Sequence, residues 1–578
     1  MIKELLKSIR EFKKASILTP TYVTGEVIME CLLPLIMAQL IDHMTGESMG
    51  PILKYGLILF LMACVSLFCG VQSGNYAATA GAGFAKNLRQ DLYFKIQDFS
   101  FADIDKFSTS SLVTRLTTDV TNIQNAFQMV IRIAVRTPLM MIFSVIMSFT
   151  ISPKMSCIFL VMIPILGGAL IGISIYVFPI FNRIFKKYDA LNNSVQENVS
   201  AIRVVKSFVR EDYEIEKFDK AADEVCQDFT RAEKILALNG PIMTFCIYVA
   251  MLLVSFLGAK MIINSHATTL TTGQLSSLIN YGVQILSSMM MLSFLFVMAS
   301  MASESGNRIV EVLKHESVLK SPVNGIKEVK DGSIEFNNVS FKYNDKSKKY
   351  ALSNINLDIP SGATIGIIGG TGSSKTSLIQ LISRLYDTTQ GNVLVGGVDV
   401  KDYDLNALRN EVAVVLQKNV LFAGTIKENL RWGNKNASDE EIERVCKLAQ
   451  ADEFVQTFPD KYDTYIEQGG TNVSGGQKQR LCIARALLKK PKILILDDST
   501  SAVDTKTDAL IRKAFEQEIP DTTKIIIAQR VSSVEHADMI LVMEGGQIVE
   551  QGNHDELMKL NGIYADVYIS QTKSKEVE

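Results

Sequence analysis

The chain contains 578 residues, of which 47% are hydrophobic and 21% are charged, and its formal net charge is −2. A chain so close to neutrality has no overall positive field for a nucleic acid, so we expect no nucleic-acid partner. Its eight cysteines are scattered, which argues against a disulfide framework and offers no metal-binding spacing. This length predicts two large domains or several average ones.

Residues 1–14 form the first predicted element, a basic amphipathic helix. Ile2, Leu5 and Ile9 fall on one helical face, and Lys3 and Lys7 lie largely elsewhere. A helix of this kind directly before a full-length apolar span is typical of an elbow on the cytoplasmic membrane surface.

Residues 15–313 contain apolar stretches long enough to cross a lipid bilayer, which takes about 20 residues each. The six candidate spans are residues 17–40, 52–74, 129–151, 155–180, 240–263 and 275–302. We therefore predict an all-α transmembrane domain with the lipid bilayer as a partner. The alternative, a large soluble protein with buried helices, is disfavoured by the length and number of these stretches.

The distribution of Lys and Arg predicts how the spans are oriented. Segments 42–50 and 264–276 contain neither residue, whereas the long segments 85–126 and 183–237 contain many. Because positive segments stay in the cytoplasm, we expect the long segments and both termini on that side. The chain is then a multi-pass protein of the cell (cytoplasmic) membrane, with helices that continue past the bilayer.

Some side chains within the spans are candidates for a substrate cavity. These are Arg132, Arg136, Gln284 and Met289. Charged residues inside a membrane commonly serve a function, and methionine suits an adaptable binding surface. Alternatively, the arginines belong to a cytoplasmic extension or snorkel, and the methionines pack between helices.

The composition changes after residue 313. A polar stretch over 314–331 predicts a linker, residues 332–570 an α/β domain, and residues 571–578 a polar tail. In the α/β domain, an apolar strand over 364–368 leads into a Gly-rich turn and a helix, as a phosphate-binding loop requires. The candidate ATP-binding residues of this loop are Gly369, Gly370, Thr371, Gly372, Ser373, Ser374, Lys375, Thr376 and Ser377.

The residue types in and near this loop predict Mg²⁺–ATP binding. Lys375 is placed to reach the β- and γ-phosphates, and the Thr376 hydroxyl to bind Mg²⁺. The apolar strand over 492–498 ends in two acids, of which Asp497 is placed to hold Mg²⁺ through water. A Ser-Gly-Gly turn at 474–476 opens a helix and can present N–H groups to a phosphate, although most such turns are only turns.

Together these pieces resemble the ATPase domain of ABC transporters in order and spacing. Residues 369–376 are similar to the Walker A loop and residues 493–497 to Walker B. The resemblance implies that Tyr343 stacks on adenine and that Gln417 contacts Mg²⁺ and the γ-phosphate. It further assigns a signature motif that contacts the partner's ATP (Ser474, Gly475, Gly476 and Gln477) and a D-loop (Ser501, Ala502, Val503 and Asp504).

The membrane half looks like the type IV ABC exporters in its six-span layout. In that family, two long cytoplasmic segments touch the ATPase domains, which implies coupling roles near Ser110–Thr118 and Ile202–Phe208. The candidate coupling residues are Arg115, Arg203 and Phe208. The implied fold is a multidomain membrane protein, an all-α six-helix transmembrane domain followed by an α/β P-loop ABC ATPase domain.

Three departures from the family pattern fall in this chain's own nucleotide site. Asp498 stands where the family has a catalytic Glu, Gln529 where it has a switch His, and Ser374 where Walker A has Gly. Asp is one methylene shorter, and a displacement of about 1 Å can cost about 10²-fold in rate. Gln cannot carry a positive charge, and Gly permits backbone paths that Ser does not.

These departures favour a degenerate site, and the pattern resembles one subunit of a bacterial heterodimeric multidrug exporter. We therefore predict ATP-driven export of amphipathic small molecules, with a second half-transporter subunit as the partner and ATP and Mg²⁺ as cofactors. Two alternatives remain open. One is a homodimeric lipid or peptide exporter whose altered residues still function, and the other is a regulatory membrane subunit that senses ATP.

Overall fold

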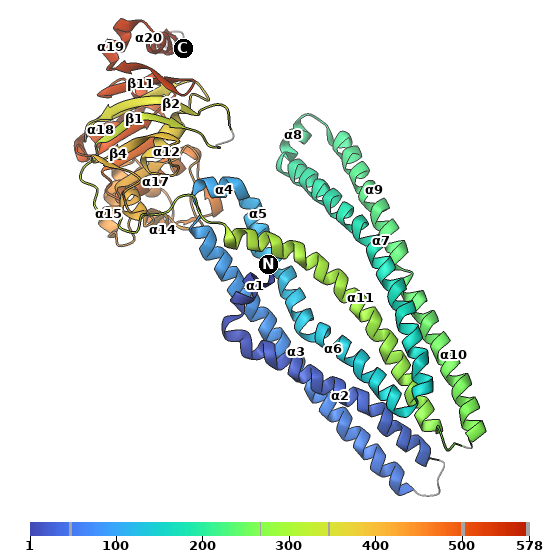
Figure 1. Ribbon diagram of the computed structural model, residues 1–578. Helices are drawn as coiled ribbons and strands as arrows, with labels where there is room; N and C mark the ends of the chain where they lie inside the picture. Colours follow the sequence, from blue (N-terminus) through green and yellow to red (C-terminus); the bar gives the residue numbers. More distant parts are fainter. Residues whose placement is uncertain (45–48, 266, 345–346, 499–502, 574–578) are drawn as a thin grey trace. The chain divides into compact units, whose positions relative to one another are not determined.

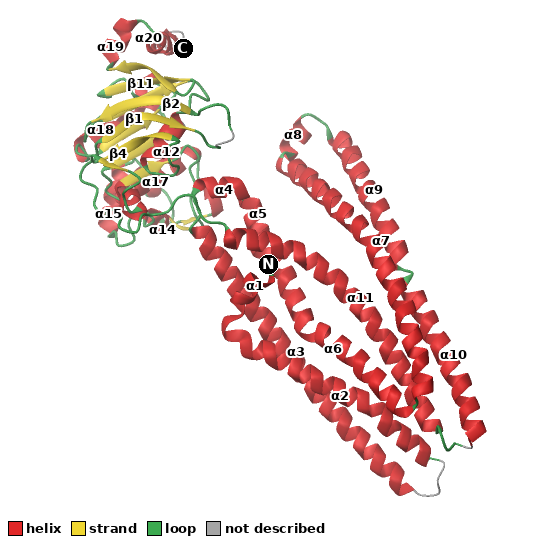
Figure 2. Ribbon diagram, in the orientation of Figure 1, coloured by secondary structure: helices red, strands yellow, loops and turns green. Residues whose placement is uncertain are grey.

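The computed structural model describes residues 1–44, 49–265, 267–344, 347–498 and 503–573 (Figure 1). These residues form two compact units. One comprises Met1–Gln97 and Thr109–His315, and the other comprises Asp98–Ser108 and the chain from Glu316 onward. Figure 2 shows that the strands belong to the second unit, whereas the first is built from helices.

Long helices build the first unit and confirm the predicted membrane domain. Within the described residues, six helical segments are long and apolar enough to cross a membrane, so the chain is a multi-pass membrane protein. Each predicted span lies inside one helix. These helices are α2 (Lys13–His43), α3 (Met49–Gln97), α6 (Val120–Ile151), α7 (Pro153–Ser200), α10 (Asn239–Ser265) and α11 (Thr272–Lys314).

Several helices continue well past the length of a bilayer. With 49 residues in α3 and 48 in α7, each is more than twice the length of about 20 residues that a bilayer takes. Shorter helices of the same unit precede or connect the long ones. They are α1 (Ile2–Leu5), η1 (Leu6–Phe12), α5 (Thr109–Thr114), the π-helical turn η2 (Arg115–Asp119), α8 (Ile202–Ser207) and α9 (Glu211–Leu236).

The N-terminal segment is helical but bends, where the amphipathic pattern predicted one helix over residues 1–14. Arg10 takes a non-helical backbone conformation, with φ 42° and ψ −117°. The segment packs on α3, where Ser8 Oγ donates to Asp91 Oδ2 over 2.7 Å and Asn87 Nδ2 donates to the Ser8 carbonyl over 3.0 Å. These contacts to a neighbouring helix hold the segment against α3 on the N-terminal side of the bend.

Buried polar groups connect α11 to α2 and α6 within the predicted spans. Tyr281 Oη donates to the Cys31 carbonyl over 2.6 Å, and Ser277 Oγ donates to the carbonyl of Pro34. On the neighbouring helices, Ser144 Oγ donates to Gln284 Oε1 over 2.9 Å. Since no water is available in a bilayer core, polar groups there must bond to one another, and these bonds hold the three helices together.

The second unit contains two main sheets. Strands β11 (Met539–Glu544), β3 (Thr364–Gly369), β10 (Thr523–Ile527), β9 (Ile493–Asp497) and β6 (Val412–Val415) run parallel, and β12 (Gln547–Gly552) adds an antiparallel edge. All residues of β9 are buried, as expected for a parallel strand that is covered on both faces. The antiparallel sheet has the order β2 (Leu352–Ile359), β1 (Ile334–Phe341), β4 (Gln390–Val395) and β5 (Val398–Asp399).

The helices of this unit surround the sheets (Figure 1). They are α4 (Phe101–Phe107), α12 (Lys375–Ile382), α13 (Leu405–Glu411), α14 (Ile426–Leu430), α15 (Asp439–Leu448), α16 (Asp452–Val455), α17 (Gly475–Leu488), α18 (Thr505–Glu518), α19 (His554–Leu560) and α20 (Ile563–Lys573), with short strands β7 (Gly424–Thr425) and β8 (Tyr465–Ile466). The helix α20 thus includes the first residues of the segment that composition predicted as a polar tail.

The segment 98–108, which follows α3, belongs to the second unit. Tyr386 Oη donates to Asp105 Oδ2 over 2.7 Å, and the Phe101 and Tyr386 rings lie 6.3 Å apart between centroids. Ser317 Oγ donates to Asp103 Oδ2 over 2.6 Å. The residues that pack against the α/β fold therefore lie just before the segment Ser110–Thr118, for which the family resemblance implied a coupling role.

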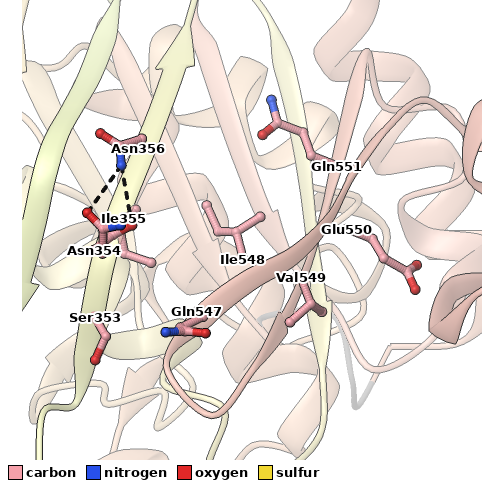
Figure 3. A pocket seen from close by; sticks show the side chains of 9 residues that line it. All are labelled: Ser353, Asn354, Ile355, Asn356, Gln547, Ile548, Val549, Glu550 and Gln551. Carbon is pink, nitrogen blue, oxygen red and sulfur yellow. Dashed lines mark hydrogen bonds between the residues drawn. The ribbon is translucent and has the colours of Figure 1, made fainter.

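The edge strands β2 and β12 line an open polar hollow of about 350 Å³ (Figure 3). Asn356 Nδ2 donates to Asn354 within it, and Ser353 N donates to the Gly546 carbonyl at its margin. None of its lining residues belongs to the predicted nucleotide site.

Candidate nucleotide-binding site

The predicted phosphate loop connects strand β3 to helix α12. The strand ends at Gly369, where a Cβ atom would lie 2.3 Å from the Met543 carbonyl oxygen, so only glycine fits against β11. The helix begins at Lys375. Its first backbone N–H groups have no partner within the helix and can bind an anion. The fold therefore supplies the strand, turn and helix N-terminus that a phosphate requires.

Ser374 occupies a strained position in this loop. It has φ 72° and ψ 26°, which is the left-handed region. A residue with a Cβ pays about 1 kcal/mol or more to stay there, whereas glycine does not. The structure thus gives the physical reason why a glycine before the lysine is favoured, and why Ser374 is a costly substitution.

The side chain of Lys375 folds back onto the phosphate loop that precedes it. Its Nζ donates to the carbonyl oxygens of Gly369 and Gly370 over 2.8 Å and 2.9 Å. Burial lowers the pKa of Lys375, and the carboxylates of Asp497 and Asp498 oppose that effect. The ammonium group is therefore positioned over the phosphate loop and close to both acids.

Thr376 and Asp497 form the candidate Mg²⁺ site. Thr376 Oγ1 donates to Asp497 Oδ2 over 2.9 Å, and Asp497 closes the buried strand β9. Burial raises the pKa of Asp497, and the neighbouring Asp498 acts in the same direction. A hydroxyl and a carboxylate are oxygen ligands of the kind that Mg²⁺ takes, with phosphates and water completing its shell. These residues therefore fit Mg²⁺ when it is carried by a nucleotide.

Asp498 is hydrogen-bonded to two other residues that the family resemblance assigned to the nucleotide site. Its Oδ2 accepts from Gln529 Nε2 over 2.7 Å and from Gln417 Nε2 over 3.4 Å. Asp498 is 8% exposed and has φ 48°, and its backbone N–H donates to the Ile527 carbonyl. The predicted positions of Gln417, Asp498 and Gln529 therefore converge on one carboxylate oxygen.

The loop that carries Gln529 is held by a residue that sequence reasoning missed. Gln571 of α20 donates from Nε2 to the Gln529 carbonyl over 2.9 Å and accepts at Oε1 from the Val531 N–H over 2.9 Å. A single glutamine more than 40 positions away leaves no signal in a sequence pattern. These two hydrogen bonds hold the backbone next to Gln529 against helix α20.

Tyr343 lies near the start of α12. Its Oη and the Ser377 hydroxyl are 2.8 Å apart, and it also donates to Gln380 Oε1 over 3.2 Å. Tyr343 is 51% exposed, and its ring meets the rings of Phe341 and Tyr386 edge-on. An exposed ring beside a phosphate loop is available to stack on a base.

The signature residues begin a different helix, α17. Ser474 caps it, accepting from the Gln477 N–H over 3.3 Å while its own N–H donates to Gln477 Oε1 over 2.9 Å. Gly475 and Gly476 form its first turn. The helix α17 packs on α14, α15 and β6, whereas α12 packs on β3 and β4. The signature turn and the phosphate loop therefore lie on separate elements of the unit.

Of the predicted D-loop, Ser501 and Ala502 lie outside the described residues. Asp504 caps α18 and accepts from the Thr507 N–H over 2.9 Å and the Thr507 hydroxyl over 2.7 Å. Its carboxylate is thus used locally, as an N-cap.

Comparison with known families agrees with this geometry. The profile of the ABC transporter transmembrane region matches residues 23–289, and the ABC transporter profile matches residues 352–501. The ABC transporter ATP-binding protein YfiB of Bacillus subtilis is 36% identical over 547 residues, which cover 94% of each chain. The chain belongs to the ABC transporter family.

More distant relatives agree. The transporter is 32% identical over 571 residues to the mitochondrial potassium channel ATP-binding subunit of Xenopus tropicalis, covering 96% of this chain and 81% of that one. Its fold matches the structure of a bacterial Atm1-family ABC exporter with ATP bound, at a TM-score of 0.83 and 23% identity over 97% of this chain and 98% of that chain. The predicted fold class is thereby confirmed.

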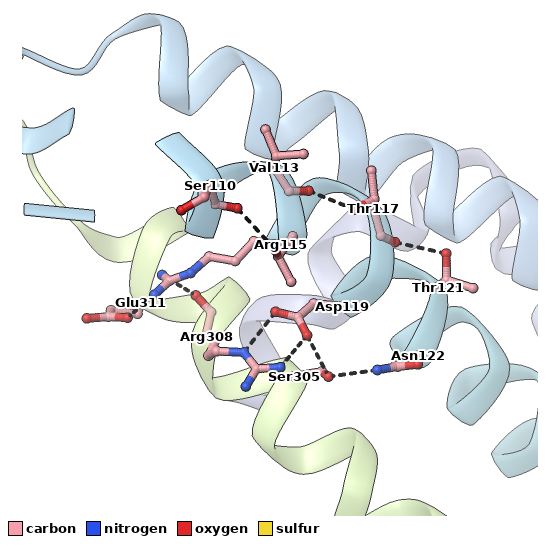
Figure 4. A network of polar contacts seen from close by, with 11 residues as sticks. Ser110, Val113, Arg115, Thr117, Asp119, Thr121, Asn122, Ser305, Arg308 and Glu311 are labelled. Carbon is pink, nitrogen blue, oxygen red and sulfur yellow. Dashed lines mark hydrogen bonds and ion pairs between the residues drawn. The ribbon is translucent and has the colours of Figure 1, made fainter. Parts of the chain in front are cut away.

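The transporter's predicted coupling residues have different surroundings. Arg115 is buried against α11, where its guanidinium donates to the Arg308 carbonyl over 2.8 Å and pairs with Glu311 over 2.9 Å (Figure 4). Arg203 belongs to the exposed helix α8, and Phe208, just after it, is 73% exposed. Arg115 is therefore packed within the membrane unit, whereas Phe208 presents an apolar surface.

The transporter's predicted cavity residues do not form one cluster. Arg136 pairs with Glu26 and Glu30 of α2, and Gln284 bonds to Ser144. The side chain of Arg132 lies beside Gly74 of α3, and that of Met289 lies beside Gly167 of α7. Sequence reasoning missed Glu26 and Glu30, because the hydropathy of a long apolar span masks two acids within it.

Proposed function

We propose that the chain is one subunit of a heterodimeric exporter that uses ATP to move amphipathic compounds across the cell membrane. Its own Walker site binds Mg²⁺–ATP through Lys375, Thr376 and Asp497 and hydrolyses it slowly or not at all. Its signature turn, Ser474–Gln477, completes the catalytic site of the partner subunit. The long cytoplasmic segments and both termini lie in the cytoplasm.

The observation that carries this proposal is the pair of amides on Asp498. A general base must be oriented so that a carboxylate oxygen can take a proton from the attacking water. Here Oδ2 of Asp498 already accepts from Gln529 and Gln417. The shorter side chain also withdraws the carboxylate from the γ-phosphate, and Gln529 supplies a neutral donor where a histidine could supply a cation.

The strain at Ser374 supports the same interpretation. A left-handed serine in the phosphate loop adds cost to the backbone path that must fit the β-phosphate. Together with Asp498 and Gln529, it places three changes in the same nucleotide site. By contrast, the signature turn keeps its serine and both glycines, so it suits a site whose Walker residues come from another chain.

Transport requires that movements of the ATP-binding unit reach the spans. Helix α8 is a candidate for this contact, because Val204 is 56%, Phe208 73% and Val209 81% exposed. Apolar side chains at the tip of a helical hairpin are unfavourable in water and suit a protein contact. In the proposed dimer, this tip docks on an ATP-binding domain and transmits its closure.

The test is ATP hydrolysis by the purified chain alone and with a candidate partner that carries an intact catalytic Glu and switch His. We expect the lone chain to be nearly silent and the pair to be active. The partner's Glu→Gln change should abolish turnover, and Asp498→Asn should leave it nearly unchanged. Brisk turnover by the lone chain, lost in Asp498→Asn, would instead establish a homodimeric ATPase.

A second function is favoured by one comparison. The Xenopus relative is by name an ATP-binding subunit of a potassium channel, which makes a regulatory role worth testing. In that case the degenerate site would sense ATP without driving transport. The two functions can be distinguished by measuring transport into vesicles that contain the active pair. ATP-dependent accumulation of an amphipathic compound in these vesicles requires an exporter.

A further inference from the structure

Three ionisable side chains meet inside the predicted spans, between α2 and α6. The guanidinium of Arg136 pairs with Oε1 of Glu26, and its Nη2 lies 2.8 Å from both carboxylate oxygens of Glu30. Two carboxylates face one guanidinium, so the cluster carries one excess negative charge. Charged groups at this depth are costly and are retained where they serve a function.

One oxygen of this cluster is left without a partner. Glu26 is 7% exposed, and its Oε2 is buried and accepts no hydrogen bond from the part of the chain that the structure describes. Both oxygens of Glu30, by contrast, accept from Arg136. Burying a carboxylate oxygen without a hydrogen-bond donor costs free energy, and a positively charged ligand next to Oε2 would offset that cost.

The neighbouring helix α3 accommodates the Glu26 carboxylate by carrying a glycine opposite it. A Cβ atom on Gly70 would lie 3.1 Å from Oε1 of Glu26, so the missing side chain leaves space for the acid. Arg132 of α6 lies beside Gly74, one turn of α3 beyond Gly70, and forms no ion pair with either glutamate among the described residues. The extra positive charge therefore does not come from Arg132.

Aromatic rings lie on the same side of α2. Tyr22 precedes Glu26 by four residues and so shares its helix face. Its ring stacks on Tyr76 of α3, with centroids 5.6 Å apart and planes at 9°, and meets Phe68 edge-on at 6.3 Å. A carboxylate next to aromatic faces is the combination that binds organic cations.

The donor set fits an organic cation better than a metal ion. Within the described residues, no three His, Cys, Asp or Glu side chains gather as metal ligands. Glu26 is followed in α2 by Val27, which belongs to a buried apolar core with residues of α6 such as Val135, so the acid sits at the edge of an apolar region. A lipophilic cation would place its charge at Glu26 and its body against the tyrosine rings of α2 and α3.

We propose that Glu26 anchors a binding site for lipophilic organic cations, with Tyr22 and Tyr76 as its aromatic wall. This deepens the proposed export function and rests on it for the transported class, which becomes positively charged amphipaths. Binding itself needs neither ATP nor a second subunit, so it can be tested separately from turnover.

The experiment uses two ions of nearly the same size and shape but opposite charge. Tetraphenylphosphonium and tetraphenylborate are equilibrated with the full-length chain in nonionic detergent, without ATP, and binding to empty micelles is subtracted. We expect the chain to prefer the cation. Glu26→Gln should weaken cation binding about tenfold or more, as loss of a charged partner does, without weakening borate binding.

Two further variants make the result specific. Glu311→Gln removes the same charge from the cytoplasmic end of α11 and should leave cation affinity unchanged. Gly70→Ala keeps every charge but crowds Glu26 and should lower cation affinity about threefold or more, so the proposal stays testable if Glu26→Gln misfolds. Equal affinity for the two ions, or unchanged cation binding in Glu26→Gln and Gly70→Ala, would overturn the proposal. Failure of ATP turnover in the pair would bear only on the export function.

Discussion

Nε2 of Gln529 donates to Oδ2 of Asp498 over 2.7 Å, so the two residues that depart from the family's catalytic pair are bonded to each other. A change at position 498 alone would leave the switch His without its catalytic Glu. A change at position 529 alone would leave the catalytic Glu without its switch His. Together they form a closed amide–carboxylate contact that also includes Gln417. Both departures therefore meet in one hydrogen-bonded contact of the nucleotide site.

Restoring both residues should restore hydrolysis. The variant Asp498→Glu with Gln529→His is tested in the pair whose partner carries a Glu→Gln change, so that only this chain's site can turn over. We expect phosphate release to rise about tenfold or more, since a general base contributes about 10²-fold or more. Asp498→Glu alone should give a smaller rise. No rise in the double variant would show that Ser374 or the partner's signature limits the site.

Relieving the strain at Ser374 should stabilise the loop. Ser374→Gly removes the cost of a left-handed residue with a Cβ, about 1 kcal/mol, although the freer unfolded chain offsets part of it. We expect the apparent melting temperature to rise by about 2 °C and ATP affinity to increase. Ser373→Gly is the matched control, because Ser373 is not among the residues with positive φ, and it should destabilise. Equal effects of the two variants would contradict the role of backbone strain.

Local patterns and three-dimensional contacts differ in what they allow one to predict. The spans and the phosphate loop were predictable because each is a contiguous run whose length or residue order carries the signal. The convergence of Gln417, Asp498 and Gln529 followed only from family resemblance, since parallel strands bring distant positions together. The bend at Arg10 could not be predicted, because the amphipathic pattern continues through it.

Other features depend on single contacts between distant segments. Glu26 and Glu30 are two acids in a span whose average is apolar, and only the pairing with Arg136 reveals them. The packing of residues 98–108 on Tyr386 likewise depends on a hydrogen bond across more than 280 positions. No periodicity in a single sequence encodes such pairs.

Gln571 should control the position of the Gln529 loop. Gln571→Ala removes both hydrogen bonds to that backbone, each worth about 1 kcal/mol. We expect faster hydrogen exchange at the Val531 amide, by about fivefold or more, and weaker ATP binding. Gln571→Glu is the matched variant, because it keeps the acceptor for Val531 and loses the donor to Gln529. It should preserve protection of Val531, and loss of that protection would argue against the assigned contacts.

A buried acid packs against the C-terminal part of α11, and this contact gives the last prediction. Asp119 is fully buried in the π-helical turn η2 and accepts from Ser305 over 2.8 Å and from Nε of Arg308 over 2.9 Å (Figure 4). Asp119→Asn removes the charge that compensates Arg308 and leaves an amide that must donate where donors already point. We expect about 2 kcal/mol of destabilisation, less than the loss of a wholly buried ion pair, because Arg308 reaches solvent.

Thermal unfolding of the full chain in detergent measures this effect. Asn122→Ala is the matched control, since it removes only a 3.2 Å hydrogen bond to Ser305 from the margin of the same network. It should cost less than about 1 kcal/mol. In the active pair, we further expect Asp119→Asn to lower transport more than ATP hydrolysis, because α11 is the helix that leads from the spans into the ATP-binding unit. A parallel fall of transport and hydrolysis would mean that the brace supports folding alone and has no separate part in coupling.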